Sequence, residues 1–81
     1  MGIEYKIRFE LPDGYSSEGL LRRLPSADIA NGSMPAYDFA LESDGFYFLD
    51  HLSDDAIAAK AFRVLVEEGL RHAESVQISE L

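Results

Sequence analysis

The chain contains no cysteine. Disulfides, thiolate nucleophiles, cysteine-based zinc sites and iron–sulfur clusters are therefore excluded, and hydrophobic packing must hold the fold. No apolar run approaches the roughly 18 residues that a membrane-spanning helix needs. The N-terminus also lacks the basic and then apolar pattern of a secretion signal. These absences predict a cytoplasmic protein that makes no contact with a membrane.

Basic residues are missing from the middle of the chain. Between Arg23 and Lys60 there is no Lys or Arg, and this stretch carries −7 of the total formal charge of −8. Such a field repels phosphates and attracts basic partners. It also favours solubility and protects an exposed strand edge from self-association. The acidic residues of the stretch are Asp28, Asp38, Glu42, Asp44, Asp50, Asp54 and Asp55.

What is present is the composition of one small globular domain over residues 1–81. Apolar residues make up 47% of the chain and charged residues 27%, which are ordinary proportions for a compact core. Residues 3–9 alternate between apolar and charged side chains, which predicts a strand with one buried face. Ser16 or Ser17 can cap a short helix that Pro25 ends. Residues 25–35 then form a long connection.

The second half of the chain begins with a predicted hairpin of residues 37–42 and 46–49. Ser53 is the predicted cap of a helix over residues 56–68, whose apolar side chains recur every three or four residues. Gly69 is expected to stop this helix in a left-handed conformation. A last alternating strand follows over residues 76–79.

The hairpin admits two registers. If Asp44 and Gly45 form a two-residue turn, Leu41 pairs with Phe48, and Phe46 and Phe48 are buried. A three-residue loop instead turns both phenylalanines outward, because a shift of one residue reverses the face of every side chain. We favour the two-residue turn, since two phenylalanines gain more free energy from burial than tyrosine and histidine do.

The βαββαβ order of these elements resembles the ferredoxin-like α/β sandwich over essentially the whole chain. The resemblance implies an α+β fold with a four-stranded antiparallel sheet, in the strand order 4-1-3-2, and two helices on one face. This arrangement hosts many unrelated functions, so it implies no activity by itself.

Residues 45–51, with the sequence GFYFLDH, resemble part of the third-strand signature of the RNA-recognition motif, which stacks bases on aromatic rings. In this chain the basic residue that opens the signature is replaced by Asp44, and the final aromatic residue by His51. The segment also lies in the stretch without Lys or Arg, where charge opposes nucleic-acid binding. We therefore expect no nucleic-acid partner.

The favoured register exposes Tyr47, Leu49 and His51 on the open face of the sheet, with Asp38 and Glu42 beside them on the edge strand. These five residues are the predicted interaction surface, and Asp38 could face His51 across the hairpin. The expected partner is a basic protein or a second copy of the chain, which would form a homodimer. The chain has no nucleophile elbow, phosphate-binding glycine pattern or metal-ligand spacing, so we expect no enzyme, cofactor or metal site.

A second hypothesis comes from the turn before the first helix. Residues 12–21 are similar to the Asp-x-Pro-Gly-Leu-Leu region of ACT regulatory domains, which bind small metabolites near this loop. The resemblance implies a sensor whose ligand would contact Asp13, Gly14, Asn31 and Gly32. A homodimer would be expected in that case as well.

Overall fold

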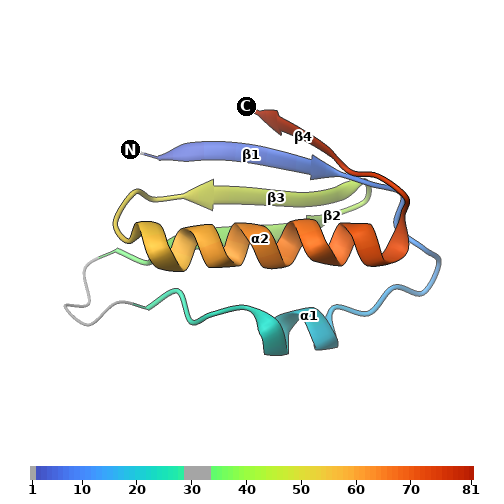
Figure 1. Cartoon of the computed structure of the whole chain (residues 1–81), viewed down its shortest axis with the longest axis horizontal. Helices are drawn as coiled ribbons and strands as arrows, with labels where there is room; N and C mark the ends of the chain where they lie inside the picture. The colour runs from blue at the N-terminus through green and yellow to red at the C-terminus, as the bar shows by residue number, and fades with distance from the viewer. Residues whose placement is uncertain (1, 29–33) are drawn as a thin grey trace.

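The computed structural model describes residues 2–28 and 34–81 (Figure 1). Two of the residues in the sensor hypothesis, Asn31 and Gly32, lie outside the described residues. The elements follow in the predicted βαββαβ order. They are β1 (Ile3–Arg8), α1 (Glu18–Arg23), β2 (Tyr37–Glu42), β3 (Gly45–Asp50), α2 (Asp55–His72) and β4 (Gln77–Glu80).

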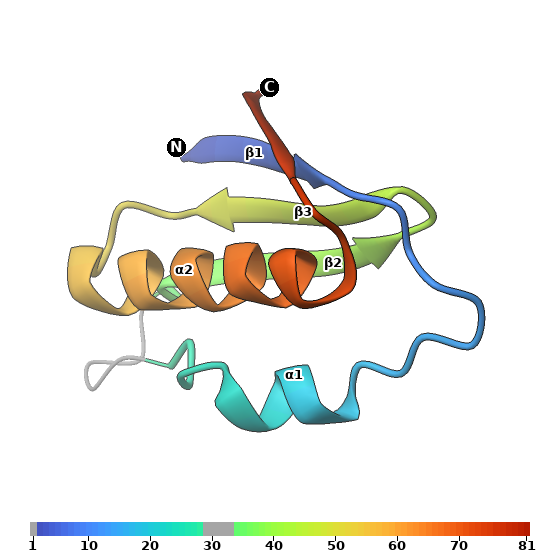
Figure 2. The ribbon, with the colours of Figure 1, turned by 45° about the vertical axis from the view of Figure 1, so that its right-hand side comes forward.

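The four strands form one antiparallel sheet in the order β2-β3-β1-β4. This confirms the predicted α+β fold, because the order 4-1-3-2 is the same sheet read from its other edge. Helix α2 lies across the middle of the sheet and packs on β1, β3 and β2, while the short α1 packs beside α2 (Figures 1 and 2). No described element covers the opposite face, called here the open face.

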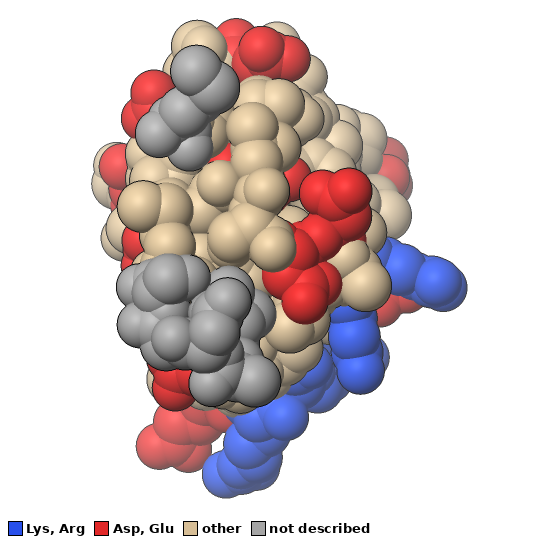
Figure 3. Space-filling view, turned by 90° about the vertical axis from the view of Figure 1, so that its left-hand side faces the viewer, with Lys and Arg blue, Asp and Glu red and all other residues tan. Residues whose placement is uncertain are grey.

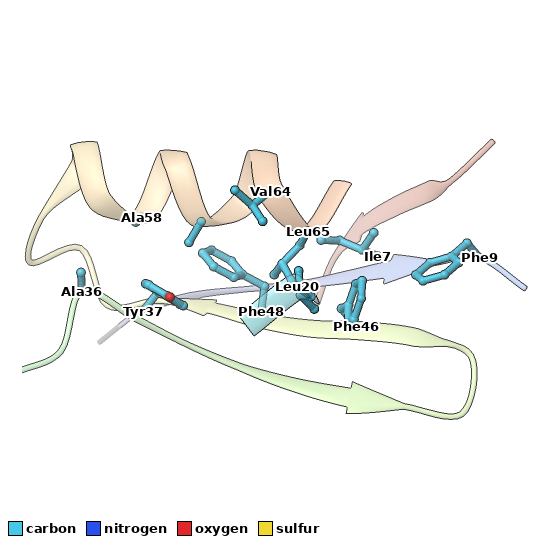
Figure 4. Packing of buried hydrophobic residues seen from close by; sticks show 11 residues of the cluster. Ile7, Phe9, Leu20, Ala36, Tyr37, Phe46, Phe48, Ala58, Val64 and Leu65 are labelled. Atoms are coloured by element: carbon cyan, nitrogen blue, oxygen red, sulfur yellow. The ribbon is translucent and has the colours of Figure 1, made fainter. Parts of the chain in front are cut away.

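The hydrophobic core lies between the sheet and α2. Odd-numbered residues of β1 and even-numbered residues of β3 point toward the helix, as the period of two along a strand requires (Figure 4). Aromatic rings pack against one another in this core. For example, the ring centroids of Phe9 and Phe46 lie 5.3 Å apart. The largest fully buried side chains are Phe46, Phe48, Ile7, Leu20 and Leu65.

The hairpin has a two-residue turn, but the predicted position was wrong. The turn consists of Ser43 and Asp44, one residue earlier than expected. Leu41 therefore pairs with Phe46 rather than with Phe48. Because the pairing moved by two residues, every side chain keeps its face, and both phenylalanines are buried as predicted.

The physical reason for the earlier turn is the environment of Gly45. Its φ of +138° is one that only glycine adopts readily. Gly45 pairs with Arg8 of β1, and a Cβ atom at this position would lie 2.0 Å from the carbonyl oxygen of Ile7. The glycine is therefore used for the close approach of β3 to β1, and the turn falls on the two residues before it.

The start of α2 also differs from the prediction. Asp54, not Ser53, is the N-cap, and its carboxylate accepts the Ile57 N–H at 3.0 Å. The Ser53 hydroxyl donates instead to the carbonyl of Pro35 at 3.0 Å. At α1 the N-cap position is Ser17, whose side chain makes no capping bond. Short α1 therefore depends on its packing for stability.

The predicted end of α2 at Gly69 was wrong, because the helix continues to His72. Gly69 is buried inside the helix, where a Cβ atom would lie 2.6 Å from the Val76 side chain and 3.1 Å from the ring of Phe9. The absence of a side chain lets the helix lie close to the sheet. Glycine therefore serves packing at this position rather than termination.

Candidate functional site

The structure places the five residues of the predicted interaction surface on one face. Tyr47 and Leu49 belong to β3, where they pair with Ala40 and Asp38 of β2. Paired residues of an antiparallel sheet point to the same side. These side chains lie on the opposite side of the sheet from Phe46 and Phe48, which is the open face. The other two members, Glu42 and His51, share this face by the same alternation.

One contact joins two of these polar side chains, and another joins Tyr47 to Glu4 of β1. The Tyr47 hydroxyl donates to Glu4 Oε2 at 2.6 Å, and His51 Nε2 lies 2.6 Å from Asp38 Oδ2. The expected contact between Asp38 and His51 thus forms, although Asp38 pairs directly with Leu49 and reaches His51 diagonally. The hydrogen bond to Glu4 raises the pKa of the Tyr47 hydroxyl, because deprotonation would place two anions side by side.

Lys6 of β1 lies at the centre of the open face. It was not predicted as a site residue from the sequence. Its side chain is only 8% exposed and contacts the carboxylates of Glu42 and Asp44, the latter at 2.5 Å. These two acids raise the pKa of the Lys6 ammonium, Asp44 contributing most. The same contact lowers the pKa of the Asp44 carboxyl. The charged side of the alternating first strand was the available signal, but the partners of Lys6 depend on the strand order.

The open face is therefore largely satisfied by internal pairs. On β2 and β3 the apolar groups of this face are Ala40, Leu49 and the ring of Tyr47, and the last two are only partly exposed. A partner that bound here would have to compete with the contacts of Lys6 and His51. Strong protein interfaces depend on desolvated apolar or aromatic anchors. The neighbouring edge strand is therefore a better candidate for a binding site than the open face.

Strand β2 forms one edge of the sheet. The N–H of His51 donates to the carbonyl of Ala36 at 3.2 Å, which shows that even-numbered residues of this segment bond to β3. By the alternation of antiparallel pairing, Tyr37, Phe39 and Leu41 direct their N–H and C=O groups outward. No backbone hydrogen bond within residues 2–28 and 34–81 reaches these outward groups. They are called the β2 edge below.

The side chains along β2 do little to block this edge against a basic strand. The strand contains no Pro or Lys and pairs with β3 without a bulge over its whole length. Natural edge strands are commonly protected by such features. Leu41 is 45% exposed, and the side chains of Asp38 and Glu42 are 62% and 45% exposed. The β2 edge is thus acidic and extended, and it is most accessible at Leu41, because Tyr37 at its other end is buried.

The residues of the sensor hypothesis do not form a comparable site. Asp13 and Gly14 are exposed residues of the turn before α1, which the N–H of Tyr15 closes by donating to the carbonyl of Pro12 at 3.2 Å. Neither residue lines the cavity beside α2 that is described below.

Two kinds of feature are missing from residues 2–28 and 34–81. They contain no group of three or more His, Asp or Glu side chains arranged to hold a metal ion. None of their helices has the length and apolar character needed to cross a membrane.

Comparison of the chain with protein-family models, with curated proteins and with solved structures finds no match.

Proposed function

We propose that this chain is a protein-interaction module that binds an extended basic segment of a partner by adding it as a strand to the β2 edge. The observation that carries the proposal is the set of outward backbone groups on Tyr37, Phe39 and Leu41, flanked by exposed acidic side chains. In strand addition, backbone hydrogen bonds supply affinity and alternate side chains supply specificity.

Charge favours a basic occupant. An added strand would place alternate side chains beside Asp38 and Glu42 on the open face, where Lys or Arg would be complementary. Opposite-charge pairs between strands contribute roughly 0.2–1 kcal/mol each. The surrounding stretch of the chain carries −7 and no Lys or Arg. This field would also raise the rate at which a basic partner is encountered.

A second copy of the chain fits the same edge less well. If two β2 strands paired antiparallel about Ala40, Asp38 of one copy would lie opposite Glu42 of the other. Like charges directly opposite one another destabilise a strand pair. Lys6, which contacts Glu42, offsets part of this repulsion and likewise part of the attraction for a basic strand. The acidic edge therefore favours a basic segment over a homodimer.

The test is an NMR titration of the ¹⁵N-labelled protein with a seven-residue peptide that alternates lysine with threonine or valine. We expect the amides of Tyr37, Phe39 and Leu41 to shift and to become protected from solvent exchange. Binding should weaken as salt is raised, because the charge pairs are screened. A peptide with glutamate in place of lysine is the matched control and should not bind.

A substitution at Leu41 separates strand addition from general charge attraction. Leu41→Pro removes one outward N–H without touching the hydrogen bonds to β3, and it should weaken peptide binding about fivefold, the value of one hydrogen bond of about 1 kcal/mol. Leu41→Ala keeps the N–H and serves as the control. The proposal fails if both variants bind equally well, or if the shifts centre on Lys6 and Tyr47 instead of the edge. Concentration-dependent dimerisation in the absence of peptide would favour the homodimer.

A further inference from the structure

A cavity of about 330 Å³ lies beside the N-terminal half of α2, where the helix crosses the ends of β1 and β3. Three aromatic rings line it. Tyr5 and Phe62 lie 5.1 Å apart between ring centroids, Phe48 and Phe62 5.4 Å, and Tyr5 and Phe48 6.4 Å. Each ring is thus close to the other two. Phe48 is fully buried, while Tyr5 and Phe62 are partly exposed walls.

Two small residues of α2 leave this space open. Ala58 and Ala59 line the cavity, and Ala58 is buried whereas Ala59 is exposed. A larger side chain at either position would project into the volume between the helix and the rings. The cavity therefore depends on the helix sequence and not only on the curvature of the sheet.

Two carboxylates lie on the same cavity. Asp50 ends β3 and Asp55 begins α2, and both belong to its lining. Asp50 Oδ1 accepts the N–H of Leu52 at 2.8 Å, which fixes the orientation of the carboxylate. Within the described residues neither carboxylate forms an ion pair, in contrast to Asp38, whose carboxylate contacts His51.

Acidic side chains are spread over this end of the molecule. Figure 3 looks onto the end where α2 begins, and there Lys and Arg side chains gather along one side only. A helix N-terminus carries a partial charge of roughly +0.5. That charge is opposed by the carboxylates of Asp54 and Asp55, and the first of these already accepts a helix N–H. The net field at the cavity therefore favours a cation over an anion.

We propose that this cavity binds a small organic cation, an alkyl- or arylammonium compound. Its apolar part would lie against Tyr5, Phe48 and Phe62, and its ammonium group would contact Asp50 and Asp55. Aromatic faces attract cations, most strongly where water is partly excluded. Ligand cavities are typically ~300–1,000 Å³, so this one suits a single ring or a short alkyl chain. The cavity shares no residue with the β2 edge, and the two proposals stand independently.

Phenethylammonium is a suitable probe, and 2-phenylethanol is its neutral counterpart of nearly equal shape. In an NMR titration of the whole chain, both should shift the amides of Ala58, Ala59 and Phe62. We expect the ammonium compound to bind about tenfold more tightly, the combined effect of one cation–π contact and a partly exposed charge pair. The preference should fall as salt is raised.

Two sets of variants distinguish the parts of the site. Replacing both acids, Asp50→Asn with Asp55→Asn, should abolish the preference for the ammonium compound and leave binding of the alcohol unchanged. Ala59→Leu should fill the cavity and remove binding of both probes. Ala56→Leu is the matched control, because Ala56 is an exposed residue of the same helix outside the cavity lining. An unchanged NMR fingerprint away from the cavity confirms that each variant is folded.

Three outcomes would overturn the proposal. The first is equal affinity for the ammonium compound and the alcohol, which would make the cavity merely apolar. The second is unchanged binding in Ala59→Leu. The third is a set of shifts around Asp13 and Gly14, which would instead support a ligand site in the turn before α1.

Discussion

Gly45→Ala is expected to lower the free energy of unfolding by about 3 kcal/mol or more. The added Cβ atom would lie 2.0 Å from the carbonyl oxygen of Ile7 and 3.1 Å from the Cα atom of Arg8. Both contacts are with backbone, so no side chain can rotate away. The φ of +138° adds conformational strain for any residue but glycine. Relief requires β3 to move away from β1 at the centre of the sheet.

Two other glycines are matched controls for this substitution. Gly14 also has a positive φ, +73°, but a Cβ atom there would meet nothing within 4 Å. Gly14→Ala should therefore cost only the conformational strain, about 1–2 kcal/mol. Gly19 lies within α1, where a Cβ atom also meets nothing, and Gly19→Ala should stabilise the protein by about 0.5–1 kcal/mol. Urea denaturation of the three variants gives the ranking. A cost for Gly45→Ala no greater than that for Gly14→Ala would show that the strands separate easily.

The order of elements could be predicted because each one carries its own local pattern. The alternation in β1 and the apolar stripe of α2 are properties of neighbouring residues. The position of the hairpin turn, in contrast, is not determined by neighbouring residues. Gly45 is a good turn residue by itself, and only the carbonyl of Ile7, on a different strand, requires glycine at that position of β3.

The ends of α2 are likewise set by contacts with distant segments rather than by local sequence signals. Ser53 and Asp54 are both good caps, and the carbonyl of Pro35 decides between them by accepting the Ser53 hydroxyl. Gly69 carries the local signal of a helix stop, yet Phe9 and Val76 pack where its side chain would be. A contact between distant segments overrides the local preference at each of these positions.

The candidate sites were predictable to different degrees. The face of Tyr47 and Leu49 follows from alternation together with the favoured two-residue turn, because any two-residue turn preserves it. The ion pairs of Lys6 require the strand order and the register together. The cavity beside α2 was missed because Tyr5 and Phe62 read as ordinary core residues. The cavity beside these rings arises where the small residues Ala58 and Ala59 of α2 cross the sheet.

A buried carboxylate joins α1 to α2. Glu68 of α2 is 5% exposed, and its Oε2 atom accepts the Tyr15 hydroxyl at 2.5 Å. The guanidinium of Arg23, the last residue of α1, bonds to the other oxygen. His72 Nε2 lies 3.5 Å from Oε2, and its ring packs edge-on against Tyr15 with 5.2 Å between centroids. Since α1 has only six residues and no side-chain cap, this cluster holds it in place.

Glu68→Ala should therefore lower the free energy of unfolding by about 3 kcal/mol. Removing one partner of a buried ion pair costs roughly 3–5 kcal/mol, because the other charge stays desolvated. Arg23 is 29% exposed, so partial hydration places the cost at the lower end of that range. Glu68→Gln keeps an acceptor for Tyr15 and should cost about 1–2 kcal/mol. Chemical denaturation measures both values, and equal costs for the two variants would show that the charge contributes little.

The contribution of the Glu68 charge to stability depends on pH. Burial by itself would raise the pKa of the Glu68 carboxyl, but the Tyr15 hydrogen bond and the charge of Arg23 outweigh it and hold the pKa below its usual value. A carboxyl with a lowered pKa stabilises the fold fully above its unfolded pKa of about 4.3 and loses that contribution as pH falls through the folded value. The difference in stability between the wild-type protein and Glu68→Gln should thus shrink as the pH is lowered from about 5 to 3.

Asp44, whose pKa is also lowered, titrates in the same acidic range in both proteins, so its contribution cancels in that difference. Denaturation curves at pH 7, 5 and 3 are sufficient to measure it. If the difference between the two proteins stayed the same at pH 3, the stabilisation by Glu68 would come from its shape and hydrogen bonds, and the charge of Arg23 would not be what attaches α1 to α2.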